Sequence, residues 1–336
     1  MDYKAAIIDA LDIMRKRDIA EKQPFKARAY ATVIKQLQQL AHIHTFEDLQ
    51  GIKGVGEQIE KKIKEVLATG TLRTAEKAKE IYQLDSLDAF QKIYGVGPVK
   101  ATELVKLGFR TIEELKAASK KNTLLLNDKQ RVGLHYYDDL LQRIPREEMD
   151  IHRTYLYEFL PAELVFDTEI VGSYRRKAET SGDIDMLIRV PTNVDSKEVA
   201  MLLQDYVQTL QKEAYIEEVL ALGDHKCMAI CRIHPDKPAR RLDLLIVPHE
   251  EYAYSLLYFT GSDRFNVAFR QHALSKGYTL NEHMLTPIRE DVIPPPPMET
   301  EKDIFTFLGL RYIEPACRVD YQQIVRITSK PKAGKF

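Results

Sequence analysis

The sequence predicts a multidomain α+β protein, with helices throughout its first part and a mixed sheet carrying helices in its second. Three observations support this prediction: a length of 336 residues, helical spacing of apolar residues before Pro145, and short apolar runs after it. Because one hydrophobic core serves roughly 100 to 200 residues, we expect more than one compact unit.

The first part is predicted to be helical. Apolar residues recur three and four positions apart in AAIIDALDIM and ATVIKQLQQLAHI, a spacing typical of amphipathic helices. A second helical stretch runs from LDAFQKIYG to LHYYDDLLQRI and closes near Ile144–Pro145, since proline disfavours helix in the residue before it. We therefore place two helical domains at residues 1–85 and 86–148.

The second part reads as strands and helices. The runs EIVGSYRR, DIDMLIRV, CMAICRI and RRLDLLIV are short and rich in Ile, Val, Leu and Tyr, as strands are. A helix is expected at SKEVAMLLQDYVQTLQ, and a helix followed by a strand at DIFTFLGLRYIEPACR. Pro294 to Pro297 indicate a polyproline spacer. We place two further domains at residues 149–260 and 261–336.

Composition narrows the class of protein. A hydrophobic share of 44% against 29% charged is typical of a packed globular chain, and the net charge of -1 argues against coating nucleic acid by positive charge. Three cysteines cannot build a disulfide framework. The start interleaves charged with apolar residues and no long apolar run follows, so we expect an intracellular protein without a membrane partner.

One pattern occurs twice. GIKGVGEQIEKKIKEVLATG and KIYGVGPVKATELVKLGF each place two glycines ahead of an amphipathic helix: Gly54 and Gly56, then Gly95 and Gly97. Glycine lets a backbone approach a partner closely, and the free amides at a helix start bind phosphate. The pair predicts phosphate contacts; an ordinary helix-turn-helix corner is the alternative. The two copies resemble helix-hairpin-helix motifs, and that resemblance implies contacts to a DNA backbone.

Three acids stand on predicted strands. Asp183 and Asp185 alternate along one strand and so face the same side, while Asp243 interrupts an apolar run on another. Such carboxylates suit Mg²⁺, and two ions could be bridged there. The turn Gly172-Ser173-Tyr174-Arg175-Arg176 offers the parts of a triphosphate cradle. In the alternative, the acids end strands or pair with Arg240 and Arg241.

Four possible zinc ligands lie close together in the sequence between the two acidic strands: His225, Cys227, Cys231 and His234. On a strand, the two cysteines would lie roughly 13 Å apart, too far for one ion. We interpret them as strand packing.

The longer motifs resemble a known family. GSYRRKAETSGDIDMLI, RRLDLLIVP, LLYFTGSDRFNVAFRQHALSKGYTLNEH and IPREEM are similar to the family X DNA polymerases of the beta type, nearly from end to end. The resemblance implies a lyase-like helical domain with the first helix-hairpin-helix motif and helical fingers with the second. A nucleotidyltransferase-type palm sheet and a small α/β thumb that selects the nucleotide would follow.

The resemblance also implies an activity. It is template-directed DNA synthesis that fills short gaps in base excision repair, by two-metal nucleotidyl transfer with Mg²⁺ or Mn²⁺. The substrates would be gapped or nicked duplex DNA and deoxynucleoside triphosphates, the protein a monomer, and its place the nucleus in a eukaryote, otherwise the cytoplasm or a virus.

Positions carry over from the family to this sequence. Asp183, Asp185 and Asp243 would bind the divalent ions, and loop carbonyls would hold Na⁺ or K⁺ at the two hairpins. Nucleotide contacts would come from Ser173, Arg176, Gly182, Tyr258, Phe259, Gly261, Asp263 and Asn266. DNA contacts would include Arg241 and Arg270, and the carbonyl donors would be Gln50, Ile52, Val55, Gln91, Ile93 and Val96.

A second activity is implied for the first domain. Lys62 matches the lysine that attacks a 5′-deoxyribose phosphate, and Lys61, Lys64 or Lys26 would lower its pKa by crowding. The matching pocket residues are Lys26, Tyr30 and Arg73.

The sequence departs from the family at four positions. Gln58 and Thr74 replace pocket lysines, Lys177 replaces a glycine, and Leu245 replaces an arginine. Other readings are a template-independent or RNA-tailing nucleotidyltransferase and a non-catalytic DNA-binding scaffold.

Overall fold

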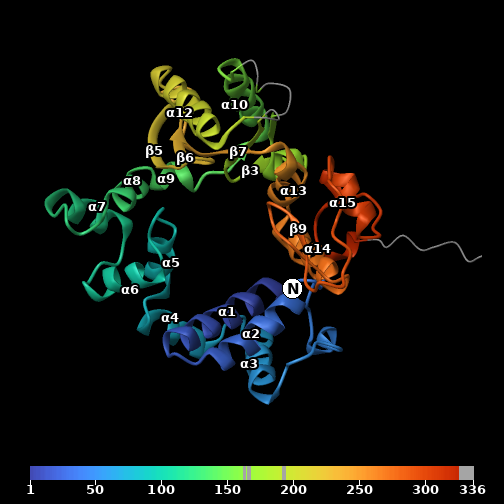
Figure 1. Ribbon diagram of the computed structural model, residues 1–336. Coiled ribbons are helices and arrows are strands. Elements are labelled where there is room, and N and C mark those ends of the chain that lie inside the picture. The colour runs from blue at the N-terminus through green and yellow to red at the C-terminus, as the bar shows by residue number, and fades with distance from the viewer. Residues whose placement is uncertain (162–163, 165–167, 191–193, 325–336) are drawn as a thin grey trace, which may run out of the picture. The chain divides into compact units, whose positions relative to one another are not determined.

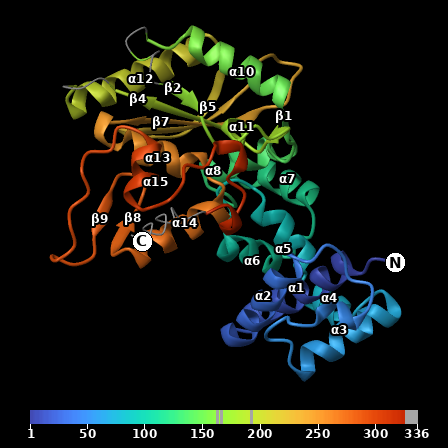
Figure 2. The same ribbon diagram turned by 90° about the vertical axis from the view of Figure 1, so that its right-hand side faces the viewer.

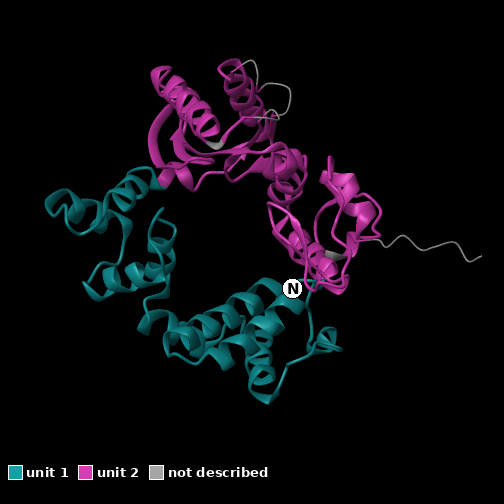
Figure 3. Cartoon of the chain, in the orientation of Figure 1, with its two compact units in different colours: residues 1–137 teal, residues 138–336 magenta. Residues whose placement is uncertain are grey.

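The computed structural model describes residues 1–161, 164, 168–190 and 194–324. The chain divides into two compact units, residues 1–137 and 138–336 (Figure 3). The division falls inside the segment predicted as fingers, and the four-domain partition remains a prediction.

The first unit is helical, as the periodicity predicted (Figure 1). One core lies among its first four helices and holds Ile7, Leu37 and Ile63, while a second lies among the next four and holds Phe90 and Leu104. The helices are α1 (Lys4–Ala20), α2 (Pro24–Leu37), α3 (Glu57–Thr69), α4 (Arg73–Ile81), α5 (Leu84–Gln91), α6 (Pro98–Lys106), α7 (Ile112–Lys121) and α8 (Asp128–His135), with a 3-10 turn, η1 (Phe46–Leu49). Helix α9 (Tyr137–Leu140) crosses the division.

The second unit is built on a five-stranded sheet of order β2-β4-β7-β6-β5, in which only the β4–β7 pair is parallel. A short ladder joins β1 to β3. The strands are β1 (Ile144–Pro145), β2 (Thr168–Ile170), β3 (Thr180–Ser181), β4 (Ile184–Arg189), β5 (Ile216–Leu222), β6 (Lys226–Cys231) and β7 (Arg240–Val247).

The two faces of this sheet bury different cores. Ile184, Met186 and Leu244 pack with α10 (Arg146–Glu158) and α12 (Ser196–Lys212). Figure 2 shows α10 and α12 on one side of this sheet. Leu187 and Leu245 point to the other face and pack with α13 (His249–Thr260). Because side chains alternate along a strand, Asp185 and Asp243 share the face of Leu187 and Leu245.

The remaining elements surround a third core that contains Phe265, Phe269 and Phe305. They are α14 (Asp263–Ser275), the hairpin β8 (Tyr278–Leu280) and β9 (Leu285–Pro287), α15 (Glu301–Phe307), and two 3-10 turns, η3 (Pro315–Cys317) and η4 (Tyr321–Gln323).

The structure confirms most predicted elements and corrects two. The strands in DIDMLIRV, CMAICRI and RRLDLLIV form, as does the helix from Ser196. In EIVGSYRR the strand ends at Ile170, and Gly172–Arg175 form a helical turn, α11. The strand predicted after α15 was wrong: that stretch turns at Gly309, where φ is 72°, and continues into η3. No helix in the described part of the chain is long and apolar enough to cross a membrane.

Candidate active site

Two of the three predicted acids are direct neighbours on the sheet. Asp185 of β4 and Asp243 of β7 are register partners in the parallel pair, and Asp183 precedes β4. Asp243 is only 5% exposed. Strand pairing therefore brings the three acids to one place, as their positions on the predicted strands suggested.

The carboxylates are close enough to perturb one another. Burial, followed by the negative charges of Asp183 and Asp243, raises the pKa of Asp185 to about 7. Two cations lie among these groups. Arg241 Nη2 lies 3.2 Å from Asp243 Oδ1 and 3.8 Å from Asp183 Oδ2, while Lys226 Nζ lies 2.9 Å from Asp243 Oδ2.

The donor set fits a hard divalent cation. All three acids offer oxygen, the ligand atom that Mg²⁺ prefers. Burial and then the two neighbouring carboxylates raise the pKa of Asp185, and a bound cation would offset both effects. The described residues hold no group of three His, Cys, Asp or Glu side chains already arranged as a metal site. Arg241 and Lys226 supply the neutralising charge in this conformation.

The turn of α11 lies against the acids. Gly172 has φ of 60°, and a Cβ there would come within 2.8 Å of Asp185 Oδ2, so glycine is required both for the turn and for the close approach. The Val171 amide donates to the Asp185 carbonyl at 2.8 Å. Ser173 Oγ donates to Ser181 Oγ at 2.9 Å, which holds the serine of the predicted cradle on β3.

One cation beside the cradle escaped sequence analysis. A Cβ on Gly182 would lie 3.0 Å from Arg143 Nη1, and Arg143 Nη2 donates to the Thr180 carbonyl at 2.8 Å. Arg143 precedes the β1–β3 ladder, whose pairing brings it to Gly182. No local motif marks this residue, because the contact joins segments far apart in sequence.

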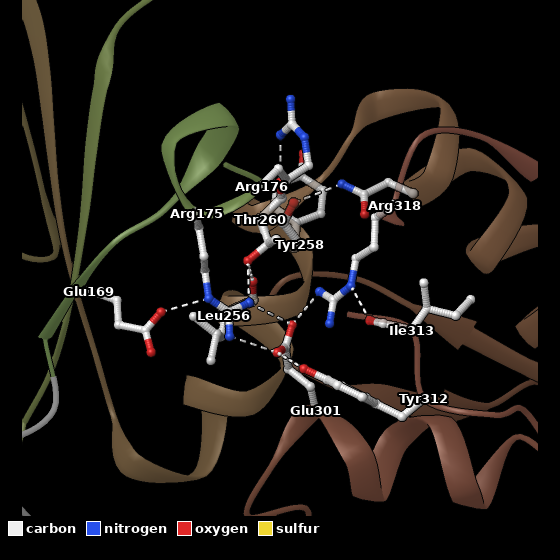
Figure 4. A network of polar contacts seen from close by, with 11 residues as sticks. Glu169, Arg175, Arg176, Leu256, Tyr258, Thr260, Glu301, Tyr312, Ile313 and Arg318 are labelled. Carbon is white, nitrogen blue, oxygen red and sulfur yellow. Dashed lines mark hydrogen bonds and ion pairs between the residues drawn. The ribbon is translucent and has the colours of Figure 1, made fainter. Parts of the chain in front are cut away.

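A buried charge network continues from α11 (Figure 4). Arg175 Nη2 donates to Glu301 Oε2 at 2.9 Å, and Arg318 Nη1 donates to Glu301 Oε1 at 2.5 Å. Glu301 is 4% exposed and Arg318 1%. Burial alone would raise the pKa of Glu301, but the two guanidinium groups outweigh it and lower that pKa.

Thr260, the last residue of α13, is held by two neighbouring arginines. Its hydroxyl accepts from Arg175 Nη1 at 2.7 Å and its carbonyl accepts from Arg176 Nη1 at 2.6 Å. Burial lowers the pKa of Arg176. The predicted triphosphate residue Arg176 is thus tied to the segment that carries the predicted nucleotide contacts.

The residues predicted to select the nucleotide gather around the α13–α14 connection. Gly261 and Asp263 lie in and after it, Asn266 Nδ2 donates to the Tyr258 carbonyl at 2.7 Å, and the Arg270 guanidinium lies 4.8 Å from the Tyr258 ring centroid. Arg270 also faces Glu282 at 3.6 Å. Leu245, which stands where the resembled family has an arginine, lines a cavity of about 480 Å³ together with Lys226, Tyr258 and Phe259.

In the first unit, Lys62 is half-buried on α3, and its Nζ donates to the Gln58 carbonyl at 3.1 Å. Burial, followed by the positive charge of Arg17, lowers its pKa. The direction was predicted, but the cause differs. Lys61 and Lys64 pair instead with acids one turn earlier on their own helix, Glu57 and Glu60.

The other predicted pocket residues lie on two helices. Lys26 is exposed near the start of α2, and Tyr30 is buried on the same helix, 6% exposed. Arg73 is exposed at the start of α4, and its amide donates to Glu65 Oε1 at 2.9 Å.

Both glycine hairpins form as predicted. Gly54 and Gly95 have φ of 89° and 80°, and Gly56 and Gly97 are the N-caps of α3 and α6. A Cβ on Gly56 or Gly97 would meet nothing within 4 Å, so each helix start is open to a partner. Of the six predicted carbonyl donors, that of Ile93 accepts from the Val96 amide at 3.0 Å.

Known families match four successive segments of this chain. They are a helix-hairpin-helix domain over residues 2–72, the fingers domain of DNA polymerase lambda over 88–141, the DNA polymerase beta palm over 143–249 and the DNA polymerase beta thumb over 255–319.

Whole-chain relatives agree with these matches. DNA polymerase lambda of Rattus norvegicus is 31% identical over 94% of this chain, and that of Arabidopsis thaliana is 29% identical over 81%. DNA nucleotidylexotransferase of Gallus gallus is 30% identical over 94%. The matches span 56%, 54% and 64% of these relatives' own lengths. With palm, thumb, fingers and hairpin segments in one chain, the protein belongs to the family X DNA polymerases, close to the beta and lambda types.

Proposed function

We propose that this protein is a template-directed DNA polymerase that fills short gaps during repair, with a 5′-deoxyribose phosphate lyase activity in its first unit. The observation that carries the polymerase proposal is the register pairing of Asp185 with Asp243. It places carboxylates from two strands side by side beneath a glycine turn that carries a serine and an arginine.

The chain's own groups would divide the reaction as follows. Asp183, Asp185 and Asp243 would hold two Mg²⁺ ions, which when bound stabilise charge on the entering and leaving oxygens. Asp243, which lies on β7 and is the most buried of the three acids, would face the primer 3′-hydroxyl. Ser173, Arg176 and the backbone at Gly182 would bind the triphosphate, with Arg143 beside them.

The remaining assignments complete the proposal. Tyr258, Phe259, Gly261, Asp263 and Asn266 would select the sugar and base, while Arg241, Arg270 and the hairpin glycines would contact DNA. The hairpin carbonyls would hold Na⁺ or K⁺. We further propose the four-domain partition of residues 1–85, 86–148, 149–260 and 261–336, a monomer, and an intracellular place of action.

Primer extension tests the polymerase proposal. The substrate is duplex DNA with a one-nucleotide gap and a 5′ phosphate, supplied with Mg²⁺ and deoxynucleoside triphosphates. Asp243→Ala should abolish extension, whereas Asp224→Ala, which removes an exposed acid from the β5–β6 turn, should extend like the parent. Extension by Asp243→Ala at the parental rate would refute the assignment.

Borohydride trapping tests the lyase proposal. A neutral Lys62 amine attacks the sugar aldehyde, water leaves, and the resulting imine is reduced to a stable adduct. Its half-buried position and lowered pKa favour the neutral amine. An adduct that survives Lys62→Ala would show that another residue reacts.

A second candidate is template-independent nucleotide addition. One relative, 30% identical over 94% of this chain, is named DNA nucleotidylexotransferase. Extension of a single-stranded primer with no template present would favour this candidate. We expect instead that extension requires the template strand.

A further inference from the structure

Lys177 adopts a backbone conformation that lysine rarely takes. It follows the α11 turn with φ of 61°, in the left-handed region. Hydrogen bonds fix this conformation on both sides, since the Lys177 amide donates to the Tyr174 carbonyl at 2.9 Å and the Ala178 amide to the Ser173 carbonyl at 3.1 Å. Glycine would fit here without strain. The lysine is therefore kept at a cost to stability.

Among the described residues, no hydrogen bond or ion pair of the Lys177 side chain offsets this cost. This side chain is exposed, and within the described ranges no carboxylate lies in ion-pair distance of its amine. The two arginines before it already have hydrogen-bond partners. Arg175 donates to Glu301 and to the Thr260 hydroxyl, and Arg176 donates to the Thr260 carbonyl. Lys177 is the cation of this turn that the fold leaves available.

The position of Lys177 suggests what it binds. Residue 177 directly follows Arg176 and ends the turn that begins with Gly172 and Ser173. A cation there adds positive charge next to Arg176, at the opposite end of the turn from Gly172, which lies against Asp185. Backbone strain retained beside a binding site is a recognised sign of function.

We propose that Lys177 is an additional phosphate-binding residue, which contacts the outer phosphates of the incoming nucleoside triphosphate and the pyrophosphate product. The inference rests on the proposed polymerase function. Lys177 is distinct from Ser173, Arg176 and Gly182, and the reaction does not require it. Its removal should weaken nucleotide binding while leaving turnover nearly intact.

Three variants separate charge from strain. Lys177→Gln removes the charge and keeps the strained backbone, whereas Lys177→Gly removes both. Lys22→Gly is the matched control: Lys22 is also an exposed lysine, has φ of 57°, and donates its amide to the carbonyl of Ile19 just past the end of α1. It shares the strain of Lys177 but belongs to the first unit.

The measurements are steady-state extension of a one-nucleotide gap, inhibition by added pyrophosphate, and thermal unfolding. Both Lys177 variants should raise KM for the nucleotide about three- to tenfold, as expected for one exposed charge on phosphate, with kcat little changed. Pyrophosphate inhibition should weaken by a similar factor. Only the glycine variants should gain Tm, by about 2–4 °C each.

The outcomes are decisive. Parental KM and pyrophosphate inhibition in Lys177→Gln would overturn the proposal, and so would a rise in KM in Lys22→Gly equal to that in Lys177→Gly. Failure of the parent protein to extend primers would instead overturn the polymerase function itself. In that case pyrophosphate binding by the parent and by Lys177→Gln, measured by calorimetry, still tests the phosphate contact.

Discussion

Arg175 Nη2 and Glu301 Oε2 lie 2.9 Å apart in a buried ion pair that joins the α11 turn to the first residue of α15. Burial pulls the pKa of Arg175 down, but the carboxylates of Glu301 and Glu169 outweigh it and raise that pKa. Glu301 serves Arg318 as well, so one carboxylate compensates two guanidinium groups. The position of α11 therefore depends on a residue more than 100 places away.

This arrangement predicts a large loss of stability in Glu301→Gln. The substitution keeps the shape of the side chain but leaves two buried arginines without their shared counter-charge. Removing one partner of a buried pair costs about 3–5 kcal/mol. The free energy of unfolding in urea, followed by circular dichroism, measures the loss.

Glu299→Gln is the control for that experiment. Glu299 lies two residues away, is 63% exposed at its side chain and pairs with His249 at 2.9 Å. An exposed pair contributes roughly 0–1 kcal/mol, so this variant should unfold nearly like the parent. Equal losses in the two variants would show that the Glu301 pairs contribute nothing particular.

The strands that carry the predicted acids could be predicted from sequence because their signal is local. The apolar runs around Asp185 and Asp243 are long enough to mark β4 and β7, and alternation gives the shared face of the acids. That the two strands are adjacent, parallel and in register is a tertiary fact. The sequence predicted that acids from adjacent strands converge, but it predicted neither the parallel direction nor the register.

The parts that escaped prediction depend on contacts between distant segments. Lys226 reaches Asp243 because β6 pairs with β7, and Glu301 reaches Arg175 from the far end of the unit. A surface-type residue such as lysine or glutamate gives no sign in sequence that it will be paired inside. The strand predicted across EIVGSYRR failed for a related reason, since the close approach of Gly172 to Asp185 turns the chain there.

Lys62 should show a pH profile that depends on Arg17. The guanidinium of Arg17 helps to lower the pKa of Lys62, so removing it should raise that pKa and reduce the neutral fraction of the amine near pH 7. We expect the borohydride-trapping profile of Arg17→Gln to move toward higher pH.

Lys61→Gln serves as the matched control for the trapping profile. Lys61 adjoins Lys62 in sequence, but its amine is 2.6 Å from Glu57 and its charge is offset there. The profile should stay at the parental position. A shift in Lys61→Gln as large as that in Arg17→Gln would restore the crowding explanation.

The second glycine hairpin predicts opposite effects for two glycine substitutions. A Cβ on Gly133 of α8 would lie 2.4 Å from the Tyr94 carbonyl oxygen and 2.8 Å from its amide nitrogen, and backbone cannot move aside cheaply. Alanine gains about 1 kcal/mol of helix propensity, but overpacking costs about 1–3 kcal/mol. Gly133→Ala should therefore be less stable in urea.

Gly97→Ala should instead keep most of its stability and lose DNA affinity. A Cβ there meets nothing within 4 Å and φ is -89°, so the fold accepts it at less than about 1 kcal/mol. The methyl group would stand where a phosphate approaches the start of α6. Fluorescence anisotropy with gapped DNA measures the loss, and parental affinity would argue against a role of this hairpin in binding.

His152 should make the protein sensitive to acid. It is fully buried on α10, and its Nδ1 lies 2.6 Å from the Tyr215 hydroxyl. Burial lowers its pKa from 6.5 to about 4, against the opposing pull of Glu148. Nuclear magnetic resonance of the imidazole protons should show one histidine that stays neutral well below pH 6, and His152→Gln identifies it.

The sign of the effect on stability follows from that shift. Between pH 6.5 and about 4 the unfolded chain binds a proton at His152 that the folded chain does not, so stability is complete above pH 6.5 and falls as the pH drops toward 4. Two and a half pKa units correspond to about 3 kcal/mol at most.

Urea unfolding at pH 7 and pH 5 should show a smaller difference for His152→Gln than for the parent. His234→Gln, at a side chain that is 70% exposed, should leave that difference unchanged. If His152→Gln instead keeps the full parental difference, acid sensitivity in this range must arise from other groups.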